Sequence, residues 1–130
     1  MQHQLEVLAS ADLVARTGAA YVQRQAAAAV ADHGQFTFAV SGGRTPWAMF
    51  AELARMDMPW SQVTLFQVDE RAAPDNDPDR NLTHLHDTLG DVKVSVVAMP
   101  VTAVALAHNR PQAIRVRRAP KRSLIQPPMI

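Results

Sequence analysis

Short apolar runs and longer amphipathic stretches alternate along the first hundred residues of this chain. Three brief runs, at residues 36–40, 63–68 and 94–99, are rich in β-branched and aromatic residues, which is typical of buried strands. Before and between them, apolar residues recur at helical spacing. The pattern therefore predicts the order helix, strand, helix, strand, helix, strand.

Each predicted helix has boundary signals. The first is expected to have Ser10 or Asp12 as its N-cap and to stop at Gly34. The second is expected to have Thr45 as its N-cap and Pro46 in its first helical position. Leucines at positions 82, 85 and 89 mark a third helix, which the glycine at position 90 ends.

This alternation predicts the α/β class, with a Rossmann-like parallel sheet, right-handed crossovers and helices on both faces. In such sheets, ligands bind at the carboxyl ends of the strands. The loops that follow the first two predicted strands are therefore the places to look for a site.

Composition supports a folded domain. The chain has 130 residues, of which 48% are hydrophobic and 19% charged, a balance typical of one globular domain. It has no cysteine, which excludes disulfides and zinc–thiolate sites. It has neither a signal-peptide pattern at its start nor an apolar stretch of about 18 residues, so we expect a cytoplasmic protein without a membrane partner.

The charge is distributed unevenly. Residues 101–130 hold 6 of the 13 basic side chains and no acidic one. We therefore expect a domain at residues 1–103 and a basic, proline-rich, poorly ordered tail at residues 104–130. The alternative is a nucleic-acid arm, which the lack of interleaved aromatic residues disfavours. Its phosphate contacts would be Arg115, Arg117, Arg118, Lys121 and Arg122.

The loop after the first predicted strand contains a Gly-Gly pair at positions 42 and 43. Glycines can adopt positive φ and bring backbone N–H groups close to a ligand, and a helix that follows adds the positive end of its dipole. The loop is therefore a candidate anion cradle, and an ordinary strand-to-helix turn is the alternative. Arg44 either holds a phosphate or points into water.

The loop after the second predicted strand contains Asp69, Glu70 and Arg71. Arg71 suits bidentate phosphate binding, and Asp69 could orient a sugar hydroxyl or take part in proton transfer. In the alternative interpretation, Asp69 caps local backbone N–H groups and Glu70 pairs with Arg71 on the surface.

The histidines do not form a metal site in this pattern. His84 and His86 are two residues apart, so they point to different sides of the predicted helix. The sequence therefore predicts no metal.

Three segments together resemble the 6-phosphogluconolactonase family, which is related to glucosamine-6-phosphate deaminase. They are F-A-V-S-G-G-R-T-P at 38–46, F-Q-V-D-E-R-A-A-P-D-N-D-P-D-R-N-L-T-H-L at 66–85 and A-M-P-V-T-A at 98–103. The resemblance covers about residues 5–103. It implies a Rossmann-like fold that is incomplete relative to the family. It also implies hydrolysis of 6-phospho-D-glucono-1,5-lactone, a sugar-phosphate lactone of the pentose phosphate pathway, to 6-phosphogluconate without a cofactor.

The resemblance also implies where the substrate lies. Arg71 would bind the 6-phosphate, and Asn81 would hold the loop that follows Arg71. The candidate substrate-binding residues are Ser41, Gly42, Gly43, Arg44, Thr45, Asp69, Arg71 and Asn81.

The sequence departs from the family in one respect. Family members carry a G-x-G-x-D-G-H-T segment in their second half, whose histidine is the expected general base, and no such segment occurs here. His108 does not have the surrounding glycines to replace it. The match ends near Ala103, which suggests a reading-frame shift or a truncation and an inactive copy.

Two other functions remain open. A sugar-phosphate isomerase or deaminase of the related group is one, although that group typically has tyrosine where Arg71 stands. A non-catalytic phosphosugar-binding fragment is the other. The sequence contains no signal for an oligomeric state.

Overall fold

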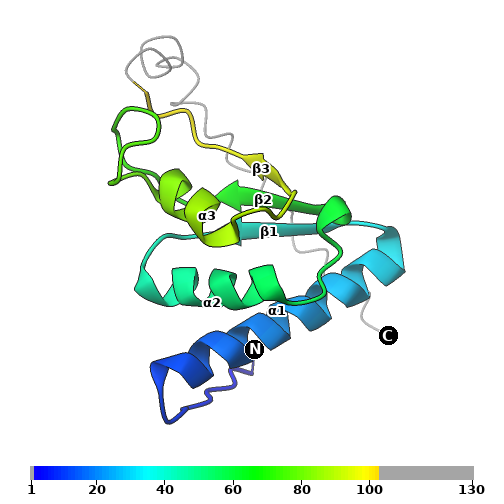
Figure 1. Cartoon of the computed structure of the whole chain (residues 1–130). Coiled ribbons are helices and arrows are strands. Elements are labelled where there is room, and N and C mark those ends of the chain that lie inside the picture. The colour runs from blue at the N-terminus through cyan, green and yellow to red at the C-terminus, as the bar shows by residue number, and fades with distance from the viewer. Residues whose placement is uncertain (1, 103–130) are drawn as a thin grey trace, which may run out of the picture.

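The computed structural model describes residues 2–102, so the predicted basic tail at residues 104–130 lies outside the described residues. In the described part, helices and strands alternate in the predicted order (Figure 1). The elements are α1 (Ala11–His33), β1 (Phe36–Val40), α2 (Arg44–Arg55), the 3-10 helix η1 (Trp60–Gln62), β2 (Val63–Gln67), α3 (Asn81–Leu89) and β3 (Ser95–Val97).

The strands form a parallel sheet in the order β1-β2-β3. Phe36 pairs with Val63, and Thr64 pairs with Ser95. Because every connection between parallel neighbours contains a helix, the α/β class and the Rossmann-like arrangement are confirmed. The predicted bounds of the first strand agree with those of β1.

The second and third strands are shorter than predicted. The last main-chain hydrogen bond between β1 and β2 runs from the N–H of Val68 to the carbonyl of Val40, at 2.9 Å. Next to it, the side-chain oxygen of Gln67 accepts a hydrogen bond from the N–H of Met99 at 2.8 Å. A side chain therefore takes the place of the main-chain ladder where β2 and β3 separate.

The helix boundaries show which capping signals apply. Ser10 is the N-cap of α1, and its hydroxyl accepts a hydrogen bond from the N–H of Leu13 at 3.2 Å. Gly34 ends that helix in a left-handed conformation, with φ of 80°. The prediction of Thr45 as the cap of the second helix is wrong, because α2 begins at Arg44 with Gly43 as its N-cap.

One face of the sheet carries the core. Alternate strand residues on this face, among them Val63 and Leu65 with 2% and 1% of their surface exposed, pack with residues from all three helices. The core cluster consists of Ala19, Val22, Ala26, Val40, Phe50, Leu53, Met58, Val63, Leu65, Leu85 and Leu89. Residues on the other face are more open, and Phe66 and Val97 are 38% and 49% exposed. Within residues 2–102, the predicted helical cover is therefore present on one face.

None of the helices in residues 2–102 combines the length and the apolar character that crossing a bilayer requires.

Candidate functional site

The loop after β1 depends on both of its glycines. Gly43 has φ of 126° and ψ of 166°, a conformation that is essentially restricted to glycine. Its carbonyl accepts the first hydrogen bond of α2, from the N–H of Trp47 at 3.0 Å. The backbone thus turns sharply into α2, whose first N–H groups have no partner within the helix.

Gly42 is needed for a different reason, which is space. A Cβ at this position would overlap the side-chain amide of Asn81, at the start of α3. The loop after β1 and the first residue of α3 are therefore in direct contact. This contact brings the two predicted loops to one place.

Replacing Gly42 or Gly43 with alanine is expected to disturb the site through two distinct effects. Gly43→Ala forces an L-residue into a glycine conformation and should destabilise the fold by about 1–3 kcal/mol. Gly42→Ala should displace Asn81 from the loop. Urea unfolding measures the first effect, and binding of 6-phosphogluconate, the ligand that the family resemblance implies, measures the second. Gly90→Ala is the control, because its positive φ of 58° also carries strain but a Cβ there meets nothing within 4 Å. Wild-type ligand affinity in Gly42→Ala would contradict the role given to this contact.

Asn81 joins the loop after β1 to the loop after β2. Its side-chain amide donates to the carboxylate of Asp69 at 3.3 Å and lies 3.4 Å from the Asp69 carbonyl. The same side-chain amide lies against Gly42. Asp69 thus accepts from a side chain rather than capping local backbone N–H groups, and the structure brings Gly42, Asp69 and Asn81 together.

Glu70 holds the two ends of the loop after β2 together, and we call its carboxylate the clamp of this loop. One carboxylate oxygen accepts from the backbone N–H groups of Arg71 at 2.7 Å and Asn81 at 2.6 Å. The other accepts from the N–H of Leu82 at 2.9 Å and from the side chain of Gln67 at 2.9 Å. This carboxylate caps α3 from 11 residues upstream and ties both ends of the loop to one point.

The partner of Glu70 is Arg80. The guanidinium Nε of Arg80 lies 3.0 Å from a Glu70 oxygen, and the two side chains are 3% and 0% exposed. A second nitrogen of Arg80 contacts Asp75 at 3.0 Å and the carbonyl of Ala73 at 3.3 Å. The alternative of a surface pair between Glu70 and Arg71 is therefore wrong, because Glu70 faces inward and receives only the backbone N–H of Arg71.

The electrostatics of the pair follow from these contacts. Burial by itself raises the pKa of Glu70, but the hydrogen bonds from Gln67, Arg71, Leu82 and Asn81 outweigh it and lower the pKa to about 2. Burial alone lowers the pKa of Arg80, and Glu70 and Asp75 more than restore it, so that it lies above its usual value. Both groups are charged near neutral pH.

Beside this clamp is an open cavity of about 390 Å³ between the first turns of α2 and α3. Its lining includes the guanidinium-bearing Arg71, Asn81 and the carboxylate-bearing Asp79. Trp47 and His84 form another part of the wall, and their rings are stacked with centroids 4.1 Å apart. Arg71 itself is exposed, and within residues 2–102 its guanidinium forms no ion pair.

Three other predicted site residues, Ser41, Arg44 and Thr45, are not part of the lining of this cavity. Ser41 and Thr45 line a more apolar cavity of about 300 Å³ between α1, β1 and α2, where Met49 and Phe50 also contribute. Arg44 is exposed and has no ion pair in the described part of the chain.

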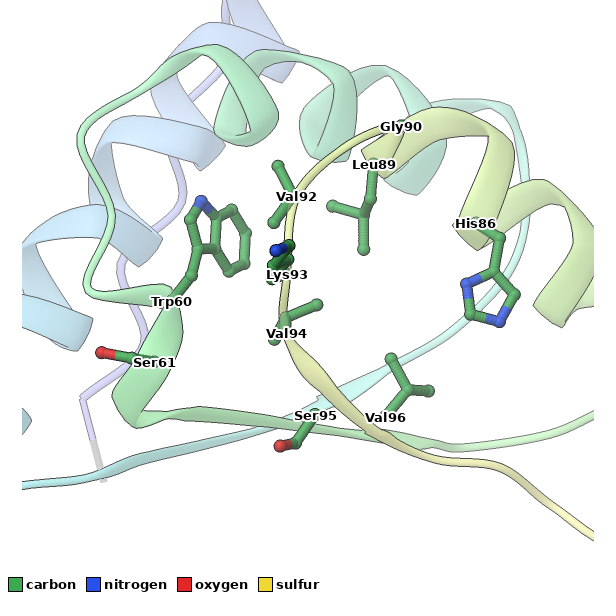
Figure 2. Close-up of a pocket in the computed structure, with 10 residues that line it drawn as sticks. All are labelled: Trp60, Ser61, His86, Leu89, Gly90, Val92, Lys93, Val94, Ser95 and Val96. Carbon is green, nitrogen blue, oxygen red and sulfur yellow. The ribbon is translucent and has the colours of Figure 1, made fainter.

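A third cavity, larger than these two, lies elsewhere. It has a volume of about 550 Å³ and is lined by the segments that lead into β2 and β3 and by α3 (Figure 2). Trp60, Leu89 and Val92 turn toward the same space in Figure 2. Because it lies at the amino ends of β2 and β3, it is not at the edge where α/β sheets bind ligands.

Sequence reasoning missed two pairs of residues. Local sequence patterns do not show the pairing of Glu70 with Arg80, because the two residues are ten positions apart in a loop. The stacking of Trp47 on His84 joins two helices that are distant in sequence. One signal for the role of Glu70 was present in the sequence. The residue before Asn81 provides no N-capping side chain, so the first backbone N–H groups of α3 need an acceptor from elsewhere.

No cluster of three or more potential metal ligands occurs within the described residues.

The fold and the paired loops define an α/β protein of the kind that binds small ligands at the carboxyl edge of a parallel sheet. A sequence model of the glucosamine-6-phosphate isomerases/6-phosphogluconolactonase family matches residues 9–122, and the chain belongs to this family. The match extends past residue 103.

Individual relatives agree with this assignment. The chain is 40% identical over 78 residues to the 6-phosphogluconolactonase of Rhizobium meliloti, with 59% of this chain and 34% of that protein covered. It is 35% identical over 81 residues to the 6-phosphogluconolactonase of Synechocystis sp., with 62% and 34% covered. The chain thus spans about a third of the length of these relatives.

A solved structure supports the same fold. The crystal structure of a 6-phosphogluconolactonase from Shewanella baltica OS155 superposes with a TM-score of 0.68 at 22% identity, covering 85% of this chain and 50% of that one.

Proposed function

We propose that this chain supplies the substrate-binding part of a 6-phosphogluconolactonase site, whose ligands are 6-phospho-D-glucono-1,5-lactone and the 6-phosphogluconate formed from it. The observation that supports this most directly is the contact of Gly42 and Asp69 with the same side chain, Asn81. Through it, the loop after β1 and a loop with an exposed arginine, Arg71, are held at one edge of the sheet. The names of the relatives supply the substrate class.

Under this proposal, each group of the site has a role in binding or hydrolysing the lactone. In lactone hydrolysis, water attacks the carbonyl carbon, the bond from that carbon to the ring oxygen breaks, and the ring oxygen leaves as a hydroxyl. Arg71 would hold the phosphate by charge-assisted hydrogen bonds. The N–H groups at the start of α2 would stabilise negative charge, either on the phosphate or on the developing oxyanion. Asp69 would orient a sugar hydroxyl.

The expected general base is a histidine in a G-x-G-x-D-G-H-T segment, which this sequence does not contain. We therefore expect this chain to bind the substrate and the product without accelerating hydrolysis. Release of acid from freshly prepared lactone, compared with the spontaneous rate, measures this. Turnover well above the spontaneous rate would contradict the expectation of a binding-only chain.

Arg71→Ala is expected to weaken binding of 6-phosphogluconate about tenfold or more, because a charged hydrogen-bond donor to the phosphate is lost. Isothermal titration calorimetry measures the dissociation constant. Arg55→Ala is the matched control, since Arg55 is an exposed arginine whose partner is Glu52 on the same helix. Glucosamine 6-phosphate, titrated in parallel, should bind more weakly if the lactonase assignment is right. Equal affinities of Arg71→Ala and the wild type would refute the proposed phosphate contact.

A further inference from the structure

Building on the proposed function, we infer that His84 is a second phosphate-binding residue of this site. In this arrangement, the cavity between the first turns of α2 and α3 receives the phosphate end of the ligand. The guanidinium of Arg71 and an imidazole N–H of His84 donate to it, and Trp47 forms the wall. Neither His84 nor Trp47 is among the candidate substrate-binding residues that the sequence predicts.

The geometry of the cavity supports this placement. Trp47, Arg71, Asn81 and His84 all line one open space of about 390 Å³, a size within the usual range for small-molecule sites. Asn81 also contacts Gly42, so the cavity adjoins the loop after β1. A ligand that spans from the cavity to that loop would lie across the carboxyl ends of β1 and β2, which is the edge where ligands bind in this class of fold.

Trp47 orients the ring of His84 without using its nitrogen atoms. Its ring lies against the indole of Trp47 with an angle of 23° between the planes, which fixes the plane of the imidazole. Stacking involves the ring faces and leaves the nitrogens at the ring edge free to donate. Within residues 2–102, no hydrogen bond to a ring nitrogen of His84 is present. His84 is half-buried, so a donor there would be partly shielded from water.

The charges around the cavity define what it can accept. Arg71 contributes a positive charge, His84 contributes a donor, and Asp79 contributes a negative charge on the same lining. An anion would therefore bind to Arg71 and His84, and a hydroxyl group of the same ligand would donate to Asp79. A phosphorylated polyhydroxy acid has both kinds of group, whereas inorganic phosphate has only one.

The test uses Trp47 as the reporter. The chain has two tryptophans, and Trp60 lies in the other cavity at the amino ends of β2 and β3, so Trp60→Phe leaves Trp47 as the only tryptophan. Fluorescence of this variant is followed while 6-phosphogluconate, gluconate or inorganic phosphate is added. We expect a saturable change with 6-phosphogluconate and a much weaker response to gluconate, which has no phosphate.

His84→Phe in the same background keeps an aromatic ring against Trp47 but removes both ring nitrogens. We expect the dissociation constant for 6-phosphogluconate to be about ten times larger, and that for gluconate to be unchanged. His86→Phe is the matched control, because His86 is on the same helix but lines the other cavity. Circular dichroism and urea unfolding establish that both variants are folded.

The outcomes separate this inference from the proposed function. If Arg71→Ala weakens binding but His84→Phe does not, the inference about His84 is wrong and the proposed function stands. If 6-phosphogluconate fails to bind the unmodified chain, both are wrong. If His84→Phe and His86→Phe weaken binding equally, the effect is a general one on α3 and the inference is also overturned.

Discussion

Replacing Glu70 with alanine is expected to destabilise the fold by about 3–5 kcal/mol, the range for removing one partner of a buried ion pair. The reason is that Arg80, only 3% exposed, would keep its charge without its main partner. In addition, the backbone N–H groups of Arg71, Asn81 and Leu82 would lose their acceptor. The free energy of unfolding from urea titrations measures the loss.

Glu52→Ala provides the matched control for this loss. Glu52 also pairs with an arginine, Arg55 at 3.1 Å, but the arginine is 71% exposed. Its removal is expected to change the stability by less than about 1 kcal/mol. If Glu70→Ala fails to fold, Glu70→Gln keeps the volume and one acceptor and still removes the charge. A loss for Glu70→Gln as small as that for Glu52→Ala would show that the clamp does not stabilise the fold.

The stability of the chain should also fall in acid because of the same carboxylate. Since the pKa of Glu70 is lowered from 4.5 to about 2 on folding, the unfolded chain binds the proton more readily than the folded chain. The stabilisation is therefore complete above about pH 4.5 and is lost as the pH falls toward 2. A shift of this size corresponds to about 3 kcal/mol.

Glu70→Gln isolates this contribution from that of the other carboxylates. The difference in unfolding free energy between the wild type and Glu70→Gln should be constant between pH 7 and 5. It should then shrink by about 3 kcal/mol between pH 4.5 and 2. Urea unfolding at several pH values measures both chains under the same conditions. A difference that does not change with pH would mean that Glu70 titrates normally in the folded chain.

Local signals in the sequence predicted most of the fold. The bounds of β1, the end of α1 at Gly34 and the end of α3 before Gly90 follow from residues at or next to those positions. The start of α2 was predicted two residues too late. Threonine and proline are strong local signals, but the conformation of Gly43 lets the helix begin at Arg44, and Pro46 still lies in the first turn, where its missing N–H has no helical partner to lose.

The site was predictable only in part, because its decisive contacts are long-range. The loops at the strand ends were expected to approach each other, since parallel strands end at one edge of a sheet. The identity of the group between them, Asn81, came from a resemblance and not from spacing. The inward turn of Glu70 and the stacking of His84 on Trp47 depend on how α3 is docked, which no local pattern encodes.

The carboxylate of Glu70 holds the two ends of the loop after β2 together, which leaves part of this loop free to vary in sequence. Because Glu70 binds the N–H groups at both ends, replacement of the side chains of residues 72, 78 and 79 need not move Arg71 or Asn81. Ala73 and Asp75 are more constrained, because they bind Arg80, the partner of Glu70. Ala72, Pro78 and Asp79 line the cavity, and we call them its rim. Selectivity for different ligands could therefore diverge on the rim while the anchoring framework beneath it remains constant.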